Sequence, residues 1–272
     1  MHPSDSWDKT IRVRPSRRHA YGTGDSQFGD LYLPTGAGPY PVVILLHGGF
    51  WRASYSLKLM RTLARDLAQR GIAVWNVEYR RVGNAGGGWP GTLQDVAHAA
   101  DFLRHIASGS TLDLNRVVTL GHSAGGQLAL WLAARARLPH QSPLSVSKTP
   151  LKLVGAVSLA GANDLKLIWH HDLGQGAARA FLGGSPHTFP ERYYLASPAA
   201  LLPLGIPQVL VHGTGDSLVP LVISQHYARQ ATLAGDHVKL IELADADHFT
   251  LINSTTPAWS RIVEEVQQLL RS

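Results

Sequence analysis

Apolar segments rich in β-branched residues alternate with helical segments along this chain, and that alternation constrains the fold more than any other feature. Residues 40–48 read YPVVILLHG, a continuous apolar run typical of a parallel strand that is buried on both faces. Similar runs recur downstream, separated by segments with helical spacing of apolar residues. The sequence predicts strands at 40–48, 72–79, 116–121, 152–161, 206–213 and 237–243, and helices at 56–71, 92–107, 124–137, 222–235 and 257–272. This order predicts an α/β fold with a mostly parallel central sheet and helices on both faces.

The predicted sheet has about eight strands, because two short strands precede the alternating region. IRVRP at 11–15 and FGDLYLP at 28–34 predict an antiparallel pair at one edge. No shift in composition marks a linker, so we expect a single domain over residues 1–272. Two Gly- or Pro-rich loops, 84–91 and 138–150, interrupt it, and residues 163–203 predict a small cap or insert that forms a substrate wall.

The composition excludes several classes of protein. The chain has no cysteine, which rules out disulfides, thiolate metal sites and a cysteine nucleophile, and its 14 histidines lack metal-ligand spacing. We therefore expect no metal site. Half of the net charge of +6 comes from the first eighteen residues, and the basic residues form no nucleic-acid reading module, so we expect no nucleic-acid partner.

The sequence also bears on location and partners. Its first thirty residues are too polar for a signal peptide, and no later apolar run is long enough to span a bilayer. We therefore expect no membrane insertion and a cytoplasmic location. A homodimer is compatible with the sequence, which does not fix the oligomeric state.

A serine lies at the sharpest predicted corner of the fold. Residues 117–137, VVTLGHSAGGQLALWLAARAR, place Ser123 between a strand and a helix in the pattern G-x-S-x-G. Such a corner forces strained backbone on the serine and needs small flanking residues where the helix and strand approach. A purely structural turn would account for the glycines, but the strand–turn–helix setting favours Ser123 as a nucleophile.

A serine nucleophile needs a base and a carboxylate that orients the base. Asp216 follows the strand 206–213, and His248 follows the strand 237–243, so the order Ser123, Asp216, His248 fits this type of sheet. Asp164, which also follows a strand, is the alternative acid. The other nearby candidates have structural interpretations: Asp245 and Asp247 shape the loop before His248, His122 cannot easily reach back to the serine, His212 lies in a buried strand, and His47 bonds local backbone.

The segment HGGFWR, residues 47–52, follows the strand that begins at Tyr40. Glycines let backbone N–H groups approach a reacting oxygen, and each such donor is worth roughly 3–4 kcal/mol of transition-state stabilisation. We expect the N–H groups of Gly49, Phe50 and Ala124 to form an oxyanion hole. Trp51, Trp89 and Trp169 are candidates, together with Phe50, for an apolar substrate pocket, although each is equally compatible with ordinary packing.

Four motifs together resemble the α/β-hydrolase superfamily: HGGFW, GHSAGG, HGTGDSLVP and DADHFTLI, in this order over about 200 residues. They are more narrowly similar to the esterase branch related to hormone-sensitive lipase and to its bacterial neighbours that resemble kynurenine formamidase. Phe50 replaces the third glycine of the usual HGGG, and His122 stands where Asp is common. Both departures favour the formamidase-like group. The resemblance implies hydrolysis of carboxylic esters or of an aryl formamide without metal or cofactor.

The leading hypothesis is a carboxylesterase that cleaves small or aryl esters through an acyl-enzyme on Ser123. Hydrolysis of N-formylkynurenine, an arylformamidase activity, is the first alternative. A peptidase is less favoured, because such relatives generally carry an N-terminal propeller. A non-catalytic ligand-binding protein of the same fold is disfavoured because Ser123, Asp216 and His248 are all present. The sequence does not identify the natural substrate.

Overall fold

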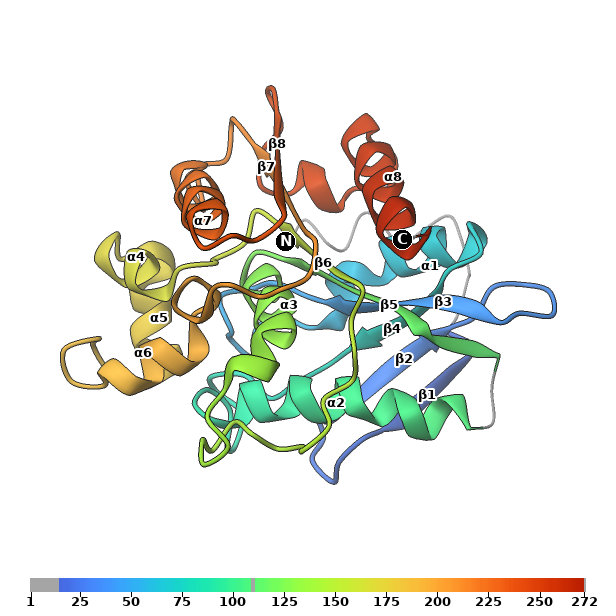
Figure 1. Cartoon of the computed structure of the whole chain (residues 1–272), viewed down its shortest axis with the longest axis horizontal. Helices are drawn as coiled ribbons and strands as arrows, with labels where there is room; N and C mark the ends of the chain where they lie inside the picture. The colour runs from blue at the N-terminus through green and yellow to red at the C-terminus, as the bar shows by residue number, and fades with distance from the viewer. Residues whose placement is uncertain (1–14, 109–110, 272) are drawn as a thin grey trace.

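Eight strands form one central sheet in the order β1-β2-β4-β3-β5-β6-β7-β8, in a computed structural model that describes residues 15–108 and 111–271 (Figure 1). From β4 to β8 every neighbouring pair is parallel, whereas β1 and β2 add an antiparallel edge. The strands are β1 (Arg17–Ala20), β2 (Phe28–Tyr32), β3 (Tyr40–Leu46), β4 (Ala73–Val77), β5 (Leu112–His122), β6 (Gly155–Leu159), β7 (Gln208–Gly213) and β8 (Val238–Leu243). The predicted mostly parallel sheet is confirmed.

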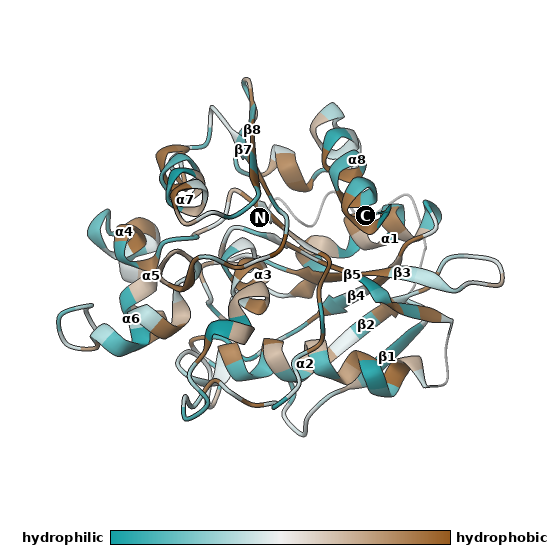
Figure 2. Ribbon diagram, in the orientation of Figure 1, coloured by the Kyte–Doolittle hydropathy of each residue, from teal (hydrophilic) through white to brown (hydrophobic). Residues whose placement is uncertain are grey.

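Helices cover both faces of the sheet, because successive side chains of each buried strand point to opposite sides. In β3, Val42 and Ile44 pack on one face and Val43 and Leu45 on the other, and all four are fully buried. The first face is covered by α2 (Gly91–Ala107), α3 (Ala124–Ala134) and α7 (Val222–Leu233), and the second by α1 (Arg61–Gln69) and α8 (Pro257–Arg271). Figure 2 shows brown, apolar segments along the inner strands and teal segments on the outer turns of α8.

Three short helices fill the segment predicted as a cap. They are α4 (Leu165–His170), α5 (Leu173–Leu182) and α6 (Pro190–Ala196), and they lie together at one side of the molecule (Figure 1). A 3₁₀ helix, η4 (Pro198–Leu201), leads from them back toward β7. These helices therefore lie near the carboxyl ends of β6 and β7.

The boundaries differ from the predicted ones in two informative places. The edge strand that pairs with β2 is β1 at Arg17–Ala20; the predicted strand at 11–15 lies outside the described residues except for Pro15. The helix predicted at 56–71 begins as the 3₁₀ helix η2 (Leu57–Met60) before α1. In the described parts of the chain, no helix combines the length and apolar character required to traverse a bilayer.

Candidate active site

Ser123 occupies the corner between β5 and α3, in a backbone conformation that few L-residues adopt. Its φ is 57° and its ψ is −119°, and its side chain is almost fully buried. Its N–H donates to the carbonyl oxygen of Leu159 (2.8 Å), and its carbonyl oxygen accepts from the N–H of Ala162 (3.2 Å). Strained residues persist only where the surrounding structure fixes them, and here the segment after β6 does so.

The glycines around the serine are required by close backbone approach. A Cβ added to Gly121 would lie 1.9 Å from the carbonyl oxygen of Gly125, and one added to Gly125 would lie 2.2 Å from that of Leu46. Real Cβ atoms do not approach a carbonyl oxygen so closely. The small residues predicted at this corner therefore allow α3 to pack directly on β5 and β3.

Asp216 and His248 come together although 32 positions separate them. Nδ1 of His248 lies 2.6 Å from Oδ2 of Asp216, and both side chains are buried. Asp216 follows β7 and His248 follows β8, and parallel neighbouring strands bring their carboxyl-end loops to one edge. The other carboxylate oxygen, Oδ1, accepts the N–H groups of Leu218 and Val219, each at 2.9 Å.

Hydrogen bonds keep the Asp216 carboxylate ionised despite its burial. Burial raises the pKa, but hydrogen bonds from His212 and His248, the charge of His248 and the Val219 N–H outweigh it and lower the pKa well below the ordinary range. Nε2 of His212 lies 3.3 Å from Oδ2. A charged, fixed carboxylate can orient an imidazole and stabilise its protonated form.

His122 connects the serine corner to the His248 loop. Nε2 of His122 lies 2.9 Å from the backbone carbonyl oxygen of His248, and the two rings are 4.4 Å apart between centres. In the part of the chain that the structure describes, neither the Ser123 hydroxyl nor Nε2 of His248 makes a hydrogen bond. The contact through His122 joins the residue before Ser123 to the loop that carries His248.

The loop after β3 lies directly against the serine. A Cβ on Gly48 would lie 2.9 Å from Cβ of Ser123, and Gly49, Phe50 and Trp51 follow with φ of 112°, 52° and 56°. Among the described residues, the N–H groups of Gly49 and Phe50 donate no hydrogen bond, and the N–H of Ala124 belongs to the first turn of α3. The assignment of these three N–H groups to an oxyanion hole stays a prediction.

The alternative acids have other partners. Asp164 caps α4 by accepting the N–H groups of Lys166 (3.0 Å) and Leu167 (3.3 Å), so the structure does not bring it to His248. Asp247 accepts from Phe249 and Thr250 within its own loop. Within the described residues, no group of three or more histidine, aspartate or glutamate side chains is arranged to hold a metal ion.

The candidate aromatic residues lie in different environments. Trp51 is only 1% exposed, stacks on Phe181 with ring centres 4.6 Å apart, and donates from its indole N–H to Gln127 (3.0 Å). The Trp51 ring thus packs in the hydrophobic core, the alternative that the sequence left open beside a substrate pocket. Trp89 and Trp169 are half-buried, and Trp169 packs edge-on against His187.

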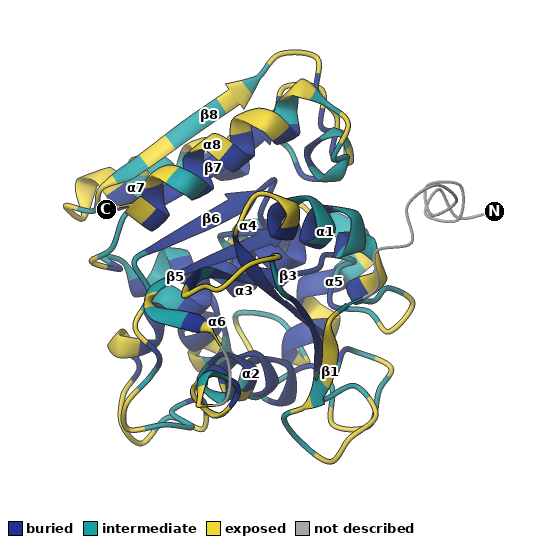
Figure 3. Ribbon diagram, turned by 90° about the vertical axis from the view of Figure 1, so that its right-hand side faces the viewer, coloured by how far each residue is buried: buried dark blue, intermediate teal, exposed yellow. Residues whose placement is uncertain are grey.

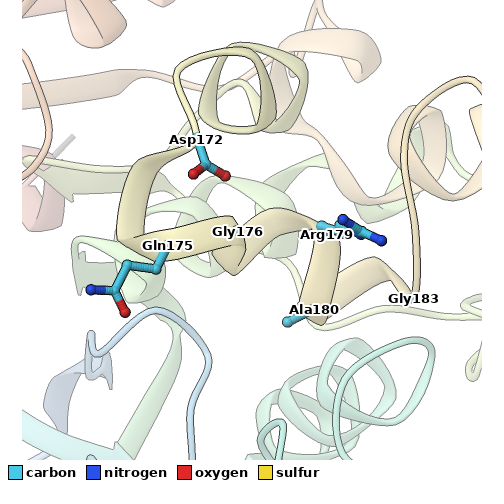
Figure 4. A pocket seen from close by; sticks show the side chains of 6 residues that line it. All are labelled: Asp172, Gln175, Gly176, Arg179, Ala180 and Gly183. Carbon is cyan, nitrogen blue, oxygen red and sulfur yellow. The ribbon is translucent and has the colours of Figure 1, made fainter.

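Arg52 links the loop after β3 to helix α5, in the segment predicted as a cap. Its Nη2 donates to the carbonyl oxygens of Gly174 (2.6 Å) and Gln175 (3.0 Å), in a segment of α5 whose residues 174–176 all have left-handed backbone. The Phe50 ring lies so close to Gly174 that a Cβ there would be 2.4 Å from it. On its outer side the segment borders an open hollow lined by Asp172, Gln175, Gly176, Arg179, Ala180 and Gly183 (Figure 4). None of the proposed catalytic residues lines this hollow.

Sequence reasoning missed three residues of the site's surroundings. His212 was interpreted as a core histidine, yet it also approaches Asp216. Glu78 and Arg52 were not singled out, although both hold the loop that begins at His47. Glu78 lies at the end of a predicted strand, and that position is the one signal that could have drawn attention to it.

Comparisons with known proteins identify the family of the chain. The family model described as BD-FAE matches residues 29–230. A probable isoprenylcysteine alpha-carbonyl methylesterase ICME from Oryza sativa subsp. japonica is 31% identical over 228 residues, which cover 78% of this chain and 52% of that protein. Kynurenine formamidase avaC from Aspergillus versicolor is 30% identical over 219 residues, which cover 68% of this chain and 74% of that protein.

A similar fold is found in a solved structure described as a truncated form of carbohydrate esterase from gut microbiota. Its TM-score is 0.82 at 18% identity, and the match covers 96% of this chain and 99% of that one. At this identity the likeness concerns the fold. The chain spans about half the length of the plant methylesterases that it matches.

Proposed function

The chain belongs to the BD-FAE family of α/β-hydrolases, and on that basis we propose that it is a carboxylesterase that forms an acyl-enzyme on Ser123. The observation that carries the proposal is the 2.6 Å hydrogen bond between His248 and Asp216, at the sheet edge where Ser123 stands on its strained corner. Relatives named as carboxylic ester hydrolases and esterases support the same reaction.

The proposed mechanism begins with proton transfer. Asp216 bonds Nδ1 of His248, which leaves Nε2 as the base for the Ser123 proton. In structures without substrate the contact between nucleophile and base is often long and tightens only when substrate binds. Oγ of Ser123 then attacks the ester carbonyl, and the N–H groups of Gly49, Phe50 and Ala124 donate hydrogen bonds to the developing oxyanion.

The second half of the catalytic cycle regenerates the free hydroxyl of Ser123. The protonated His248 gives its proton to the leaving alkoxide, so the alcohol departs and the acyl group remains on Ser123. His248 next takes a proton from water, whose oxygen attacks the acyl carbonyl. His248 then gives this proton to Oγ of Ser123 as the bond between Oγ and the acyl carbon breaks, which releases the acid and restores the serine hydroxyl. General-base assistance of this kind contributes about 10²–10⁴-fold.

Aryl formamide hydrolysis is the second candidate function. The kynurenine formamidase that is 30% identical to this chain favours it, and the same serine, histidine and aspartate would serve. Ester hydrolysis is preferred because several of the relatives carry esterase names. The expectations of cytoplasmic location, of a homodimer and of no nucleic-acid partner remain predictions.

The test is a panel of p-nitrophenyl esters of increasing acyl length, assayed beside N-formylkynurenine. We expect ester turnover by the wild type, none above background for Ser123→Ala, and unchanged turnover for Ser260→Ala, which removes an exposed hydroxyl on α8. Equal turnover by the wild type and Ser123→Ala would refute the proposal. A preference of two orders of magnitude for the formyl amide would replace esterase by formamidase.

A further inference from the structure

Exposed apolar side chains gather beside the proposed acid and base. In the residues that the structure describes, the large apolar side chains that are exposed are Tyr194, Leu218, Val222, Leu233 and Phe249. Three of these five belong to the segments that follow β7 and β8: Leu218 and Val222 come shortly after Asp216, and Phe249 comes directly after His248. Single exposed apolar residues are ordinary on a protein surface, whereas a concentration of them marks a binding surface. We call Leu218, Val222 and Phe249 the apolar rim.

Hydrogen bonds hold the two segments that form the apolar rim against each other. The Gly215 N–H donates to the carbonyl oxygen of Ala246 (3.0 Å), and the Asp245 N–H donates to Oγ1 of Thr214 (3.1 Å). A Cβ added to Gly213 would lie only 2.0 Å from the same Ala246 oxygen, so the two backbones are in direct contact. The residues of the apolar rim therefore come from adjacent segments and not from distant parts of the surface.

Phe249 packs against the proposed base. Its ring lies edge-on to the ring of His248, with centres 5.4 Å apart and planes 86° apart, and its centre is 6.3 Å from that of the His122 ring. Phe249 is nevertheless 47% exposed, whereas His122 and His248 are both buried. Part of the aromatic ring thus contacts the imidazole, and the remainder is open to solvent.

The backbone at Phe249 is fixed by a turn around Asp247. Oδ1 of Asp247 accepts the Phe249 N–H (3.0 Å) and both the N–H (2.7 Å) and the hydroxyl (2.6 Å) of Thr250. Hydrogen bonds to an ionised carboxylate are stronger than those between neutral groups, and here the bonds from Thr250 lower the pKa of Asp247. A substrate that contacts Phe249 therefore meets a segment that is already ordered, which reduces the entropy lost on binding.

The proposed reaction determines which part of an ester would lie beside Phe249. The protonated His248 gives its proton to the leaving alkoxide, so the alcohol oxygen must come within about 2.6–3.2 Å of Nε2 of His248. The acyl carbon is instead bonded to Oγ of Ser123, and its oxygen is directed to the proposed oxyanion hole. The alcohol part of the substrate is therefore the part held next to His248, on which Phe249 packs.

We infer that Phe249, in the apolar rim, binds the leaving alcohol of the substrate, and that the site favours esters of bulky, apolar alcohols over esters of short ones. The inference rests on the proposed function, because it assigns one part of the same substrate. Phe249 is then a specificity-determining residue, which contacts the alcohol and takes part in no bond that forms or breaks.

The experiment compares 2-phenylethyl acetate with ethyl acetate. Their alcohols have similar acidity, and both esters give the same acetyl-enzyme, so their kcat/KM values differ through contacts with the alcohol before it leaves. We expect the wild type to favour 2-phenylethyl acetate about 10-fold, the order expected for one aromatic contact and the apolar area that it buries. Phe249→Ala should abolish most of this preference, and Phe249→Leu, which keeps an apolar side chain, should retain part of it.

The ratio of the two kcat/KM values separates a specificity role from a structural one. If Phe249 only supported His248, Phe249→Ala would slow both esters equally and leave the ratio unchanged, and that result would overturn the inference. A wild type without preference between the two esters would overturn it as well.

A second series of substrates distinguishes the alcohol from the acyl group. Among p-nitrophenyl esters from acetate to octanoate the alcohol is constant, so we expect Phe249→Ala to show the same dependence on acyl length as the wild type. A changed dependence on acyl length would overturn the assignment of Phe249 to the alcohol.

The matched control is Leu233→Ala, which removes another exposed apolar side chain. Leu233 is the last residue of α7, before the chain enters β8, so it lies toward the amino end of that strand and away from His248. We expect Leu233→Ala to keep the wild-type preference between the two acetates. Failure of the proposed function appears elsewhere, as turnover that persists in Ser123→Ala.

Discussion

Nε2 of His122 donates to the backbone carbonyl oxygen of His248 across 2.9 Å, so the residue before the proposed nucleophile holds the loop of the proposed base. The other ring nitrogen, Nδ1, is buried without a hydrogen-bond partner among the described residues. A neutral ring with its proton on Nε2 satisfies this arrangement, whereas a second proton on Nδ1 would be buried without an acceptor.

The first prediction concerns stability against pH. Burial, and then the charge of His248, lower the pKa of His122 well below 6.5. The unfolded chain therefore binds a proton that the folded chain does not, and stability falls as pH drops below about 6.5. Between pH 7.5 and 5.5 we expect the wild type to lose about 1 kcal/mol more than His122→Gln in urea unfolding. Parallel pH dependence in the two proteins would contradict this origin.

The second prediction separates strain from chemistry at Ser123. Its positive φ costs a non-glycine residue about 1–3 kcal/mol, whereas glycine adopts it freely. Ser123→Gly and Ser123→Ala should both be inactive, but Ser123→Gly should be more stable than Ser123→Ala by about 1 kcal/mol, after allowance for the greater freedom of glycine in the unfolded chain. Thermal unfolding of the two variants measures the difference, and an alanine variant of equal or higher stability would show that the corner is not strained.

The third prediction tests the role of Asp216. Asp216→Asn keeps the size of the side chain but removes the charge that orients His248, so kcat should fall by about 10³–10⁴ with little change in the melting temperature. Asp164→Asn is the comparison, because it removes the charge of the alternative acid, keeps a side-chain oxygen that can cap α4, and leaves the His248 contact intact. A greater loss of kcat in Asp164→Asn than in Asp216→Asn would reverse the assignment of the acid.

The fourth prediction concerns the hydrogen bonds from Arg52 to helix α5. Without its guanidinium, two carbonyl oxygens in the left-handed segment of α5 lose their donor. We expect Arg52→Ala to increase hydrogen exchange at residues 173–177 and to raise KM several-fold, since Phe50 packs on the same segment. Exchange at the distant helix α8 provides the internal reference and should not change. Unaltered exchange at 173–177 would show that packing alone holds the segment.

Much of the fold was accessible from the sequence because its signals are local. The β-branched run at 40–48 and the glycines around Ser123 act within a few residues, and both were located within the elements that the structure contains. The order of motifs also placed Asp216 and His248 after neighbouring strands. Chain order could not exclude Asp164, because only the contact across 32 positions distinguishes the two acids.

Contacts between distant segments account for what the sequence could not predict. Arg52 reaches Gly174 across 122 positions, and Glu78 reaches His47 across 31, so neither pairing leaves a periodic pattern. Trp51 was expected at a pocket because large aromatic residues serve equally in pockets and cores. Its burial, its stacking on Phe181 and its hydrogen bond to Gln127, 76 positions away, place it in the core.

The strands that carry the three proposed catalytic residues differ in how well they are shielded from water. The residues of β5 that lead to Ser123 are buried, whereas β8, which leads to His248, is the outermost strand of the sheet and is partly exposed along its whole length (Figure 3). Local unfolding occurs more readily in elements that are poorly shielded from water. On heating, detachment of β8 would separate the imidazole from the serine while the central sheet persists, so enzymatic activity should disappear several degrees before the circular dichroism signal.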